Sequence, residues 1–189
     1  MRFKNSYKDK IKEYVLKNNL TYSIDTMGCQ LNENDSSKYS GILESMGFKK
    51  TDSEHANLVL FNTCCVRENA ENTLFGRLGY LKNRKLNEDN VFICVVGCMT
   101  QQKHILEKIK KSYPFVDIVL GTNAISLFPQ KLNNVIFNNK KEIEYIEALN
   151  EIEEDIPIKF DDKYKASVSI IYGCNNFCTY CIVPYVRGR

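Results

Sequence analysis

Histidine and long apolar runs are both scarce in this chain of 189 residues. Only two histidines are present, so a zinc site built from cysteine and histidine lacks one of its two usual ligand types. The longest apolar run, from Val91 to Met99, is too short to cross a bilayer. No charged segment followed by an apolar one opens the chain, so we expect no secretory signal, no membrane partner and a cytoplasmic location.

An excess of charge of one sign is also missing. The chain carries 26 basic and 23 acidic residues, a net charge of +3, which is too balanced to indicate nucleic-acid binding by itself. Hydrophobic residues make up 43% and charged residues 26% of the chain, as is usual for globular proteins. Disorder is therefore excluded as the main state of the chain.

Cysteine, in contrast, is abundant, with eight residues. In a small secreted domain they would indicate disulfides, but no export signal is seen. Thiols stay reduced in the cytoplasm, where clustered cysteines more often bind metal or take part in chemistry. The positions of the cysteines are therefore the main guide to function.

Short apolar runs alternate with helical patterns over residues 21–138, which predicts an α/β domain. The runs expected to be strands are 22–27, 58–61, 91–96, 116–120 and, as a possible fifth, Val135–Phe137. Helices are expected between them, the first starting near Asn34–Ser36 and the others covering 66–81, 100–111 (capped by Thr100) and 125–132. Continuous apolar strands favour a doubly wound parallel sheet covered on both faces.

The two ends of the chain differ from this domain. Residues 1–20 predict an N-terminal helical extension whose basic face either contacts RNA or, as we prefer, is solvated. Residues 139–164 include seven acidic and no basic residues between Glu142 and Asp155, which is typical of a linker. Residues 165–189, with a strand expected at Ala166–Ile171, read as the truncated start of a second domain, because one strand cannot bury its own core.

Three cysteines, at positions 29, 64 and 98, each follow a predicted strand. The carboxyl ends of parallel strands share one edge of the sheet, and ligands bind there. Following helices point their N-termini at this edge, which favours thiolates and a negatively charged cluster. The sequence therefore predicts that Cys29, Cys64 and Cys98 form one metal site. Cys94, inside a strand, and Cys65 are read as buried hydrophobes, although Cys65 could replace Cys64 as a ligand.

The remaining cysteines form a C-x3-C-x2-C pattern at Cys174, Cys178 and Cys181. Three thiolates on one loop suit an iron–sulfur cluster with one iron left open for a small molecule. A zinc site would need a fourth ligand. No Cys or His follows in this chain, although the part of the protein that we expect to be missing could supply one.

This second pattern, with an aromatic residue before its last cysteine, resembles the radical S-adenosylmethionine signature. The motifs over residues 22–189 resemble, in order, those of the methylthiotransferase family: Met27-Gly28-Cys29-Gln30-Leu31-Asn32-Glu33, Asn62-Thr63-Cys64, Arg67-Glu68, Gly97-Cys98, and Gly173 to Gly188. The resemblance implies an N-terminal methylthiotransferase domain followed by the start of a radical SAM barrel.

The resemblance also implies the cofactors. Cys174, Cys178 and Cys181 would ligate a [4Fe–4S] cluster that binds S-adenosyl-L-methionine, with Tyr180 either near the adenine or merely packing. Cys29, Cys64 and Cys98 would ligate a second, auxiliary [4Fe–4S] cluster. Cys65 lies where the family usually has a small or polar residue and is not assigned a role.

Within the family, Gln30-Leu31 and Arg67-Glu68 favour the branch that acts on dimethylallyladenosine in tRNA. That branch adds a methylthio group to C2 of N6-dimethylallyladenosine, next to the anticodon. The threonylcarbamoyladenosine branch and the ribosomal-protein branch are the alternatives. A radical formed from S-adenosylmethionine, with an electron donor, would activate the adenine carbon, and the auxiliary cluster would supply sulfur. We expect tRNA as the partner, bound at a single-stranded loop.

Two alternative functions from other classes of protein remain open beside the methylthiotransferase hypothesis. A flavodoxin-like electron carrier would need a hydroxyl- and glycine-rich phosphate loop after the first strand, where Met27-Gly28-Cys29-Gln30 is a poor match. A zinc-binding interaction module would bind zinc and no iron. The resemblance also implies that this chain lacks most of the radical barrel, so we expect that residues 1–189 alone do not complete the reaction.

Overall fold

The computed structural model of the chain describes residues 5–52, 55–143, 155–160 and 162–188. The helices are α1 (Asn5–Asn18), α2 (Gln30–Ser45), α3 (Glu68–Asn87), α4 (Lys103–Ser112), α5 (Phe128–Asn138) and α6 (Val183–Val186), with 3-10 turns η1 (Cys98–Gln101) and η2 (Ile125–Leu127). The strands are β1 (Thr21–Met27), β2 (Lys49–Lys50), β3 (Leu58–Thr63), β4 (Phe92–Gly97), β5 (Ile118–Leu120) and β6 (Glu142–Ile143). Within these residues, no helix is long and apolar enough to span a membrane.

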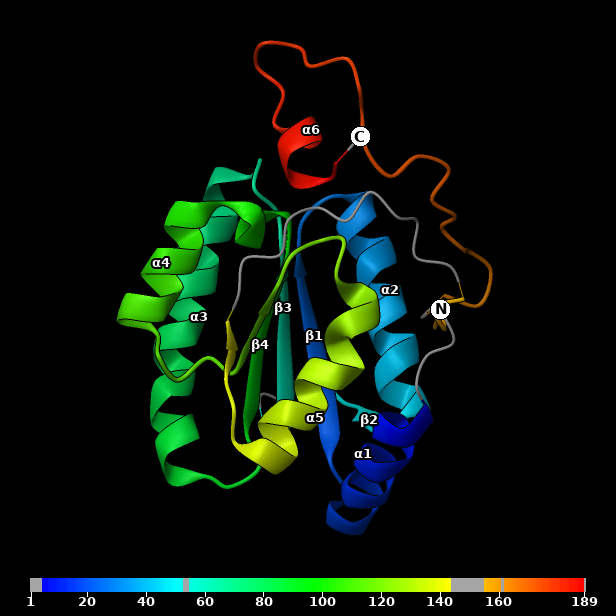
Figure 1. Ribbon diagram of the computed structural model, residues 1–189, viewed down its shortest axis with the longest axis vertical. Coiled ribbons are helices and arrows are strands. Elements are labelled where there is room, and N and C mark those ends of the chain that lie inside the picture. Colours follow the sequence, from blue (N-terminus) through cyan, green and yellow to red (C-terminus); the bar gives the residue numbers. More distant parts are fainter. Residues whose placement is uncertain (1–4, 53–54, 144–154, 161, 189) are drawn as a thin grey trace.

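The six strands form one sheet in the order β2-β1-β3-β4-β5-β6, and every neighbouring pair is parallel. Helices α1, α2 and α5 cover one face, and α3 and α4 cover the other (Figure 1). The predicted α/β class with a parallel sheet covered on both faces is therefore confirmed. The strand order reverses between β1 and β3, and this switch point is where sheets of this kind bind ligands.

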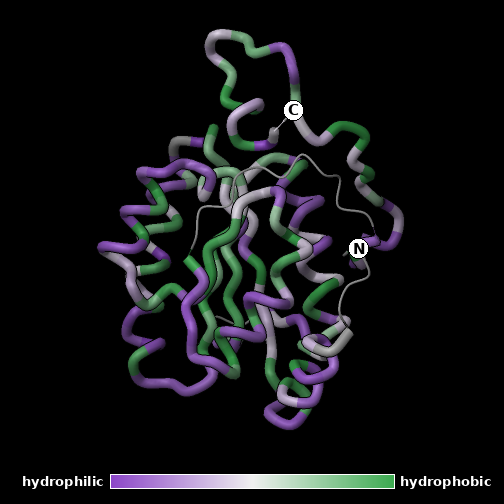
Figure 2. Tube along the Cα trace, in the orientation of Figure 1, coloured by the Kyte–Doolittle hydropathy of each residue, from purple (hydrophilic) through white to green (hydrophobic). Residues whose placement is uncertain are grey.

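Two hydrophobic clusters, one on each face of the sheet, hold these layers together. One joins Leu60 of β3 to Leu43 of α2 and Leu132 of α5, and the other joins Phe61 of β3 to Leu74 of α3. Neighbouring residues of β3 thus serve opposite faces, as the alternation of a strand requires. The central strands β3 and β4 are among the most hydrophobic parts of the chain (Figure 2), and all their residues are buried because helices cover both faces of the sheet.

The N-terminal helix is part of this packed unit rather than an appendage. Ile11 and Val15 of α1 are fully buried in the cluster that also contains α5. Tyr14 packs edge-on against Phe137, with the two ring centroids 5.6 Å apart. The expectation of a separate extension over residues 1–20 is therefore wrong for the described part, residues 5–20, because its apolar stripe covers the end of the sheet domain.

Several predicted elements also differ from the structure. The helix α2 begins at Gln30, before the expected Asn34, because Cys29 takes the N-cap position. Val135–Phe137 lies in α5 rather than in a strand, since Phe128, Leu132 and Val135 share one helical face. The last strand is instead β6, inside the segment expected to be a linker.

The C-terminal segment folds back over the sheet domain without forming the expected strand. Residues 166–171 have no strand partner among the described residues and are extended without a ladder. The start of a radical SAM barrel is thus not seen as regular structure, because a lone strand cannot satisfy its own backbone hydrogen bonds. Residues 144–154, which make up most of the acidic segment between Glu142 and Asp155, lie outside the described residues.

Candidate metal centre

The cysteines at positions 29, 64 and 98 follow three strand ends that are in register. Met27 of β1 pairs with Thr63 of β3, which in turn pairs with Gly97 of β4. Adjacent strands lie about 4.8 Å apart, so the three backbones leave the sheet side by side. The structure therefore places all three cysteines on the carboxyl edge of the sheet, at and beside the β1/β3 switch point.

The turn that carries Cys29 is fixed by two buried asparagines. The Cys29 amide donates to Oδ1 of Asn32 at 3.3 Å, and the Cys29 thiol donates to the same atom at 3.4 Å. Asn32 Nδ2 donates to Oδ1 of Asn62 at 2.9 Å, and Asn62 Nδ2 donates back to the Asn32 carbonyl at 2.8 Å. Both amides are fully buried, so this exchange ties the start of α2 to the end of β3.

Close backbone approach also shapes the edge. A Cβ atom at Gly28 would lie 2.3 Å from Oδ1 of Asn32, and one at Gly97 would lie 2.5 Å from the Thr63 carbonyl oxygen. Gly97 adopts a φ of +105°, which is disfavoured for residues with a side chain. The glycines before Cys29 and Cys98 are therefore required by the geometry of the edge.

Cys65 takes part in the edge, contrary to its reading as a buried hydrophobe. The Cys65 thiol is hydrogen-bonded to Cys98, and this bond, together with the contribution of Arg187, lowers the pKa of Cys98 to about 7 although burial acts in the opposite direction. The same bond raises the pKa of Cys65, and burial and the nearby Cys64 add to the rise. Cys98 is thus the member of this thiol pair that ionises first.

Arg187, from the C-terminal segment, also reaches this edge. Its Nε donates to the sulfur of Cys98 at 3.0 Å, and its NH1 donates to Oδ2 of Asp35 at 2.6 Å. Burial raises the pKa of Asp35, whereas the charge of Arg187 acts to lower it. All three side chains are almost completely buried, so the charge-assisted contacts form away from water.

The second cysteine triad lies on the loop before α6, beyond the carboxyl ends of the strands (Figure 1). Cys174 and Cys181 are partly exposed and Cys178 is exposed. The Cys181 amide donates to the Cys178 carbonyl at 2.9 Å, and Tyr180 is 91% exposed. The loop therefore presents its thiols and its aromatic ring outward.

The donor set suits a thiolate-bound group, although the thiols are not gathered as ligands. All eight cysteines lie in described residues, and none forms a disulfide. Within the described ranges, no three His, Cys, Asp or Glu side chains are grouped to hold a metal ion. Four thiols at one edge, one of them ionising near neutral pH, nevertheless fit an iron–sulfur group. The ligand roles of both triads remain predictions.

Cys94 has the role that its position predicts. It lies in the middle of β4, has no exposed surface and belongs to the core cluster on the α2 and α5 face. Burial raises the pKa of its thiol well above the usual value. Cys94 is therefore a core residue, which makes it a suitable control for the other cysteines.

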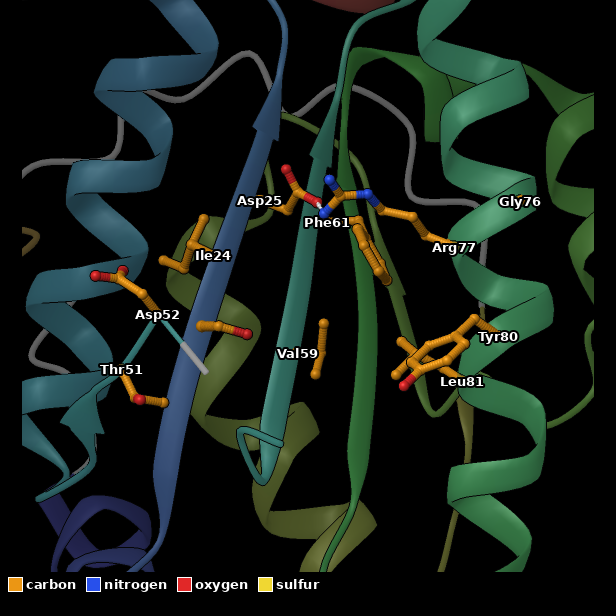
Figure 3. A pocket seen from close by; sticks show the side chains of 11 residues that line it. Ile24, Asp25, Thr51, Asp52, Val59, Phe61, Gly76, Arg77, Tyr80 and Leu81 are labelled. Carbon is orange, nitrogen blue, oxygen red and sulfur yellow. Dashed lines mark hydrogen bonds and ion pairs between the residues drawn. The ribbon is translucent and has the colours of Figure 1, made fainter. Parts of the chain in front are cut away.

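A separate hollow of about 480 Å³ lies on the face of the sheet that α3 covers, against β1 and β3 (Figure 3). Asp25 of β1 and Arg77 of α3 form an ion pair across it. Val59, Tyr80 and Leu81 line its apolar part. No cysteine lines this hollow, so it is distinct from the carboxyl edge.

Comparison with known proteins identifies the family. Residues 21–121 match the sequence profile of the uncharacterized protein family UPF0004. The chain belongs to this family. The match spans β1 to the end of β5 and includes Cys29, Cys64 and Cys98, so the methylthiotransferase resemblance of the motifs is confirmed.

Similar proteins carry a more specific name. The chain is 52% identical over 169 residues to the tRNA-2-methylthio-N(6)-dimethylallyladenosine synthase of Clostridium botulinum strain Hall, a match that covers 89% of this chain and 38% of that relative. It is also 52% identical over 170 residues to the synthase of the same name from Clostridium tetani, with the same coverage of both chains. The chain thus spans about 38% of the length of these curated relatives.

Sequence reasoning missed three features of the edge. Arg187 and Asp35 are 152 positions apart, and the sequence marks them only as part of the Gly173–Gly188 block and of the expected helix start at Asn34–Ser36, not as partners. The asparagines at 32 and 62 were recognised only as letters of the family motifs. The contact of Cys65 with Cys98 follows from the register of β3 and β4, which the sequence pattern predicts only as a shared edge.

Proposed function

We propose that this chain forms the cluster-binding N-terminal part of a radical SAM tRNA methylthiotransferase. The reaction would add a methylthio group to C2 of N6-dimethylallyladenosine next to the anticodon. The observation that carries the proposal is the registered carboxyl edge, at which Cys29, Cys64 and Cys98 leave three adjacent strands. The names of the relatives support the substrate.

In this proposal the two triads hold two [4Fe–4S] clusters. Cys29, Cys64 and Cys98 would hold the auxiliary cluster, and Cys174, Cys178 and Cys181 would hold the cluster that binds S-adenosyl-L-methionine. When bound, these groups supply the radical and sulfur chemistry, which side-chain acids and bases cannot provide.

The chain's own residues would prepare the edge for that chemistry. The lowered pKa of Cys98 provides a thiolate near neutral pH, which is the form that binds iron. The pair of Asn32 and Asn62 holds the turn of Cys29. Tyr180, on the exposed loop, is available to contact the adenine of S-adenosylmethionine.

The partners follow from the proposed reaction. The substrate would be a tRNA whose anticodon-loop adenosine can be turned out of its stack. S-adenosylmethionine and an electron donor would complete the reaction, in the cytoplasm. Threonylcarbamoyladenosine tRNA or a ribosomal protein would be the alternative substrate. The activity would belong to the whole protein. The match with the Clostridium botulinum synthase covers only 38% of that relative.

One structural observation bears on the flavodoxin-like alternative. The strand order 2-1-3-4-5 is that of flavodoxin-type sheets, which bind a flavin at the β1/β3 switch point. Here α2 begins at Gln30, three residues after β1 ends at Met27. Only Gly28 and Cys29 separate the two elements, which leaves no room for a loop that wraps a phosphate.

Anaerobic reconstitution with iron and sulfide tests the proposal. We expect the wild-type chain to bind two four-iron clusters and the variants Cys29→Ala, Cys64→Ala and Cys98→Ala to lose one of them. Cys94→Ala is the matched control, because Cys94 lies inside β4 in the hydrophobic core, and we expect it to retain the wild-type iron content. Binding of zinc with no iron would instead favour a zinc-binding interaction module.

A further inference from the structure

Arg187 is the residue through which the two cysteine triads meet in the fold. Its side chain contacts Cys98, a member of the first triad. The next residue, Gly188, accepts a hydrogen bond at 3.1 Å through its carbonyl oxygen from the amide of Cys174, the first cysteine of the second triad. A single dipeptide therefore links the sheet edge to the loop that lies above it.

The pairing geometry of Arg187 is unusual for a purely structural arginine. A guanidinium beside a carboxylate commonly makes two parallel hydrogen bonds to it. Here only NH1 binds Asp35, whereas Nε is used for the sulfur of Cys98. The NH2 group is buried and has no hydrogen-bond partner. Leaving a charged donor buried and unpaired is costly, so this group has the capacity to serve one more acceptor at the edge.

Other contacts hold the same segment in place without touching a thiol. Thr122 Oγ1 donates to the Val186 carbonyl at 2.6 Å. Asn34 Nδ2 donates to the Ser167 carbonyl at 2.7 Å, and the Ser169 hydroxyl donates to Oδ1 of Asn34 at 3.1 Å. These bonds hold the segment at residues 167, 169 and 186, so the donation of Arg187 to sulfur is one docking contact among several.

We propose that Arg187 is a positioning residue shared by both cysteine triads, anchored by Asp35 and donating N–H groups to the anionic sulfur gathered at the sheet edge. In the iron-free chain the acceptor is the sulfur of Cys98. In the loaded chain the unpaired NH2 would find its acceptor in a second thiolate or an inorganic sulfide. The inference rests on the proposed function only for this loaded state.

The link between the triads is tested in the iron-free chain by amide hydrogen exchange. Arg187→Gln removes the positive charge. Arg187→Lys keeps the charge, but lysine lacks the planar guanidinium that donates to Cys98 and Asp35 at the same time. We expect either variant to speed exchange over residues 172–188 about tenfold or more. Arg84→Gln is the control, because Arg84 is as buried as Arg187 and contacts Glu88 and the Ala56 carbonyl away from the cysteine edge; it should leave exchange over 172–188 unchanged.

The donation to sulfur is tested by the midpoint potential of the auxiliary cluster. The cysteines at 174, 178 and 181 are replaced by alanine, so that only one cluster can form. Hydrogen bonds to cluster sulfur stabilise the more negative, reduced state. We therefore expect Arg187→Gln to shift the midpoint potential to a more negative value, Arg187→Lys to shift it less, and Arg84→Gln to leave it at the wild-type value.

The outcomes separate this inference from the proposed function. A chain that takes up no iron would contradict the proposed function, while the exchange experiment would still decide the link. Wild-type exchange over 172–188 in both Arg187 variants would overturn the link. Faster exchange with an unchanged potential would overturn the donation to sulfur and leave Arg187 as a docking contact.

Discussion

Gly97 offers a direct test of how the fold shapes the cysteine edge, through the substitution Gly97→Ala. The residue has φ = 105° and ψ = −167°, a region that is open almost only to glycine and that costs another residue about 1–3 kcal/mol. Its new Cβ would also lie 2.5 Å from the Thr63 carbonyl oxygen and 2.8 Å from the Thr63 amide nitrogen. Both atoms belong to the backbone of β3, so they can move only if the β3–β4 ladder is disturbed.

Forcing extra volume into such a packed site costs about 1–3 kcal/mol. Together with the backbone strain, we expect Gly97→Ala to lower the free energy of unfolding by about 2–6 kcal/mol. The whole free energy of unfolding of a typical domain is only about 5–15 kcal/mol. The new Cβ would also push on Oδ1 of Asn62 at 2.5 Å. The substitution therefore disturbs the edge on both sides of Cys98.

Urea unfolding of the iron-free chain, followed by circular dichroism, measures this loss. Gly79→Ala is the matched control: Gly79 lies in α3, and a Cβ there has no neighbour within 4 Å. In a helix interior that change should stabilise the protein by about 0.5–1 kcal/mol. If Gly97→Ala unfolded within about 0.5 kcal/mol of the wild type, the argument from close approach and backbone strain would be refuted.

Three further predictions concern buried polar groups. Asn62→Leu should cost about 2–4 kcal/mol in denaturant unfolding, because it removes the three hydrogen bonds that the Asn62 side chain makes with Asn32 and Ser36; a smaller loss than about 1 kcal/mol would contradict the role given to the asparagine pair. In the iron-free chain, alkylation of Cys98, followed by peptide mass spectrometry, should reach half its maximal rate at about pH 7, and Cys65→Ala should move that midpoint upward; an unmoved midpoint would exclude the thiol–thiol bond as the main cause. For Glu142 burial acts to raise the pKa, but hydrogen bonds from Lys131 and Asn134 outweigh it and the pKa is lowered. The carboxylate therefore stabilises the fold above its unfolded pKa near 4.5 and loses that effect as the pH falls through the lower folded value, so Glu142→Gln should destabilise the protein at pH 7 and much less at pH 3.

The fold class could be predicted from the sequence because its signals are local. A strand buried on both sides needs a continuous apolar run, and the runs at 58–61 and 91–96 mark β3 and β4 to within two residues. The position of cysteines just after these runs then places them at one edge, since parallel strands all end on the same side. Local pattern failed at short apolar runs, because Val135–Phe137 fits a strand as well as a helix until its tertiary neighbours are known.

By itself, the sequence determined the parallel sheet, the edge with its cysteines and the family, each of which depends on neighbouring residues or on ordered motifs. Only the tertiary structure decided which groups act on those cysteines. The contacts of Arg187 with Cys98 and Asp35 join residues 89 and 152 positions apart. The bond between Cys65 and Cys98 depends in the same way on how two strands end beside each other. The physical reason is that hydrogen bonds between distant segments are set by packing, and no local propensity records them.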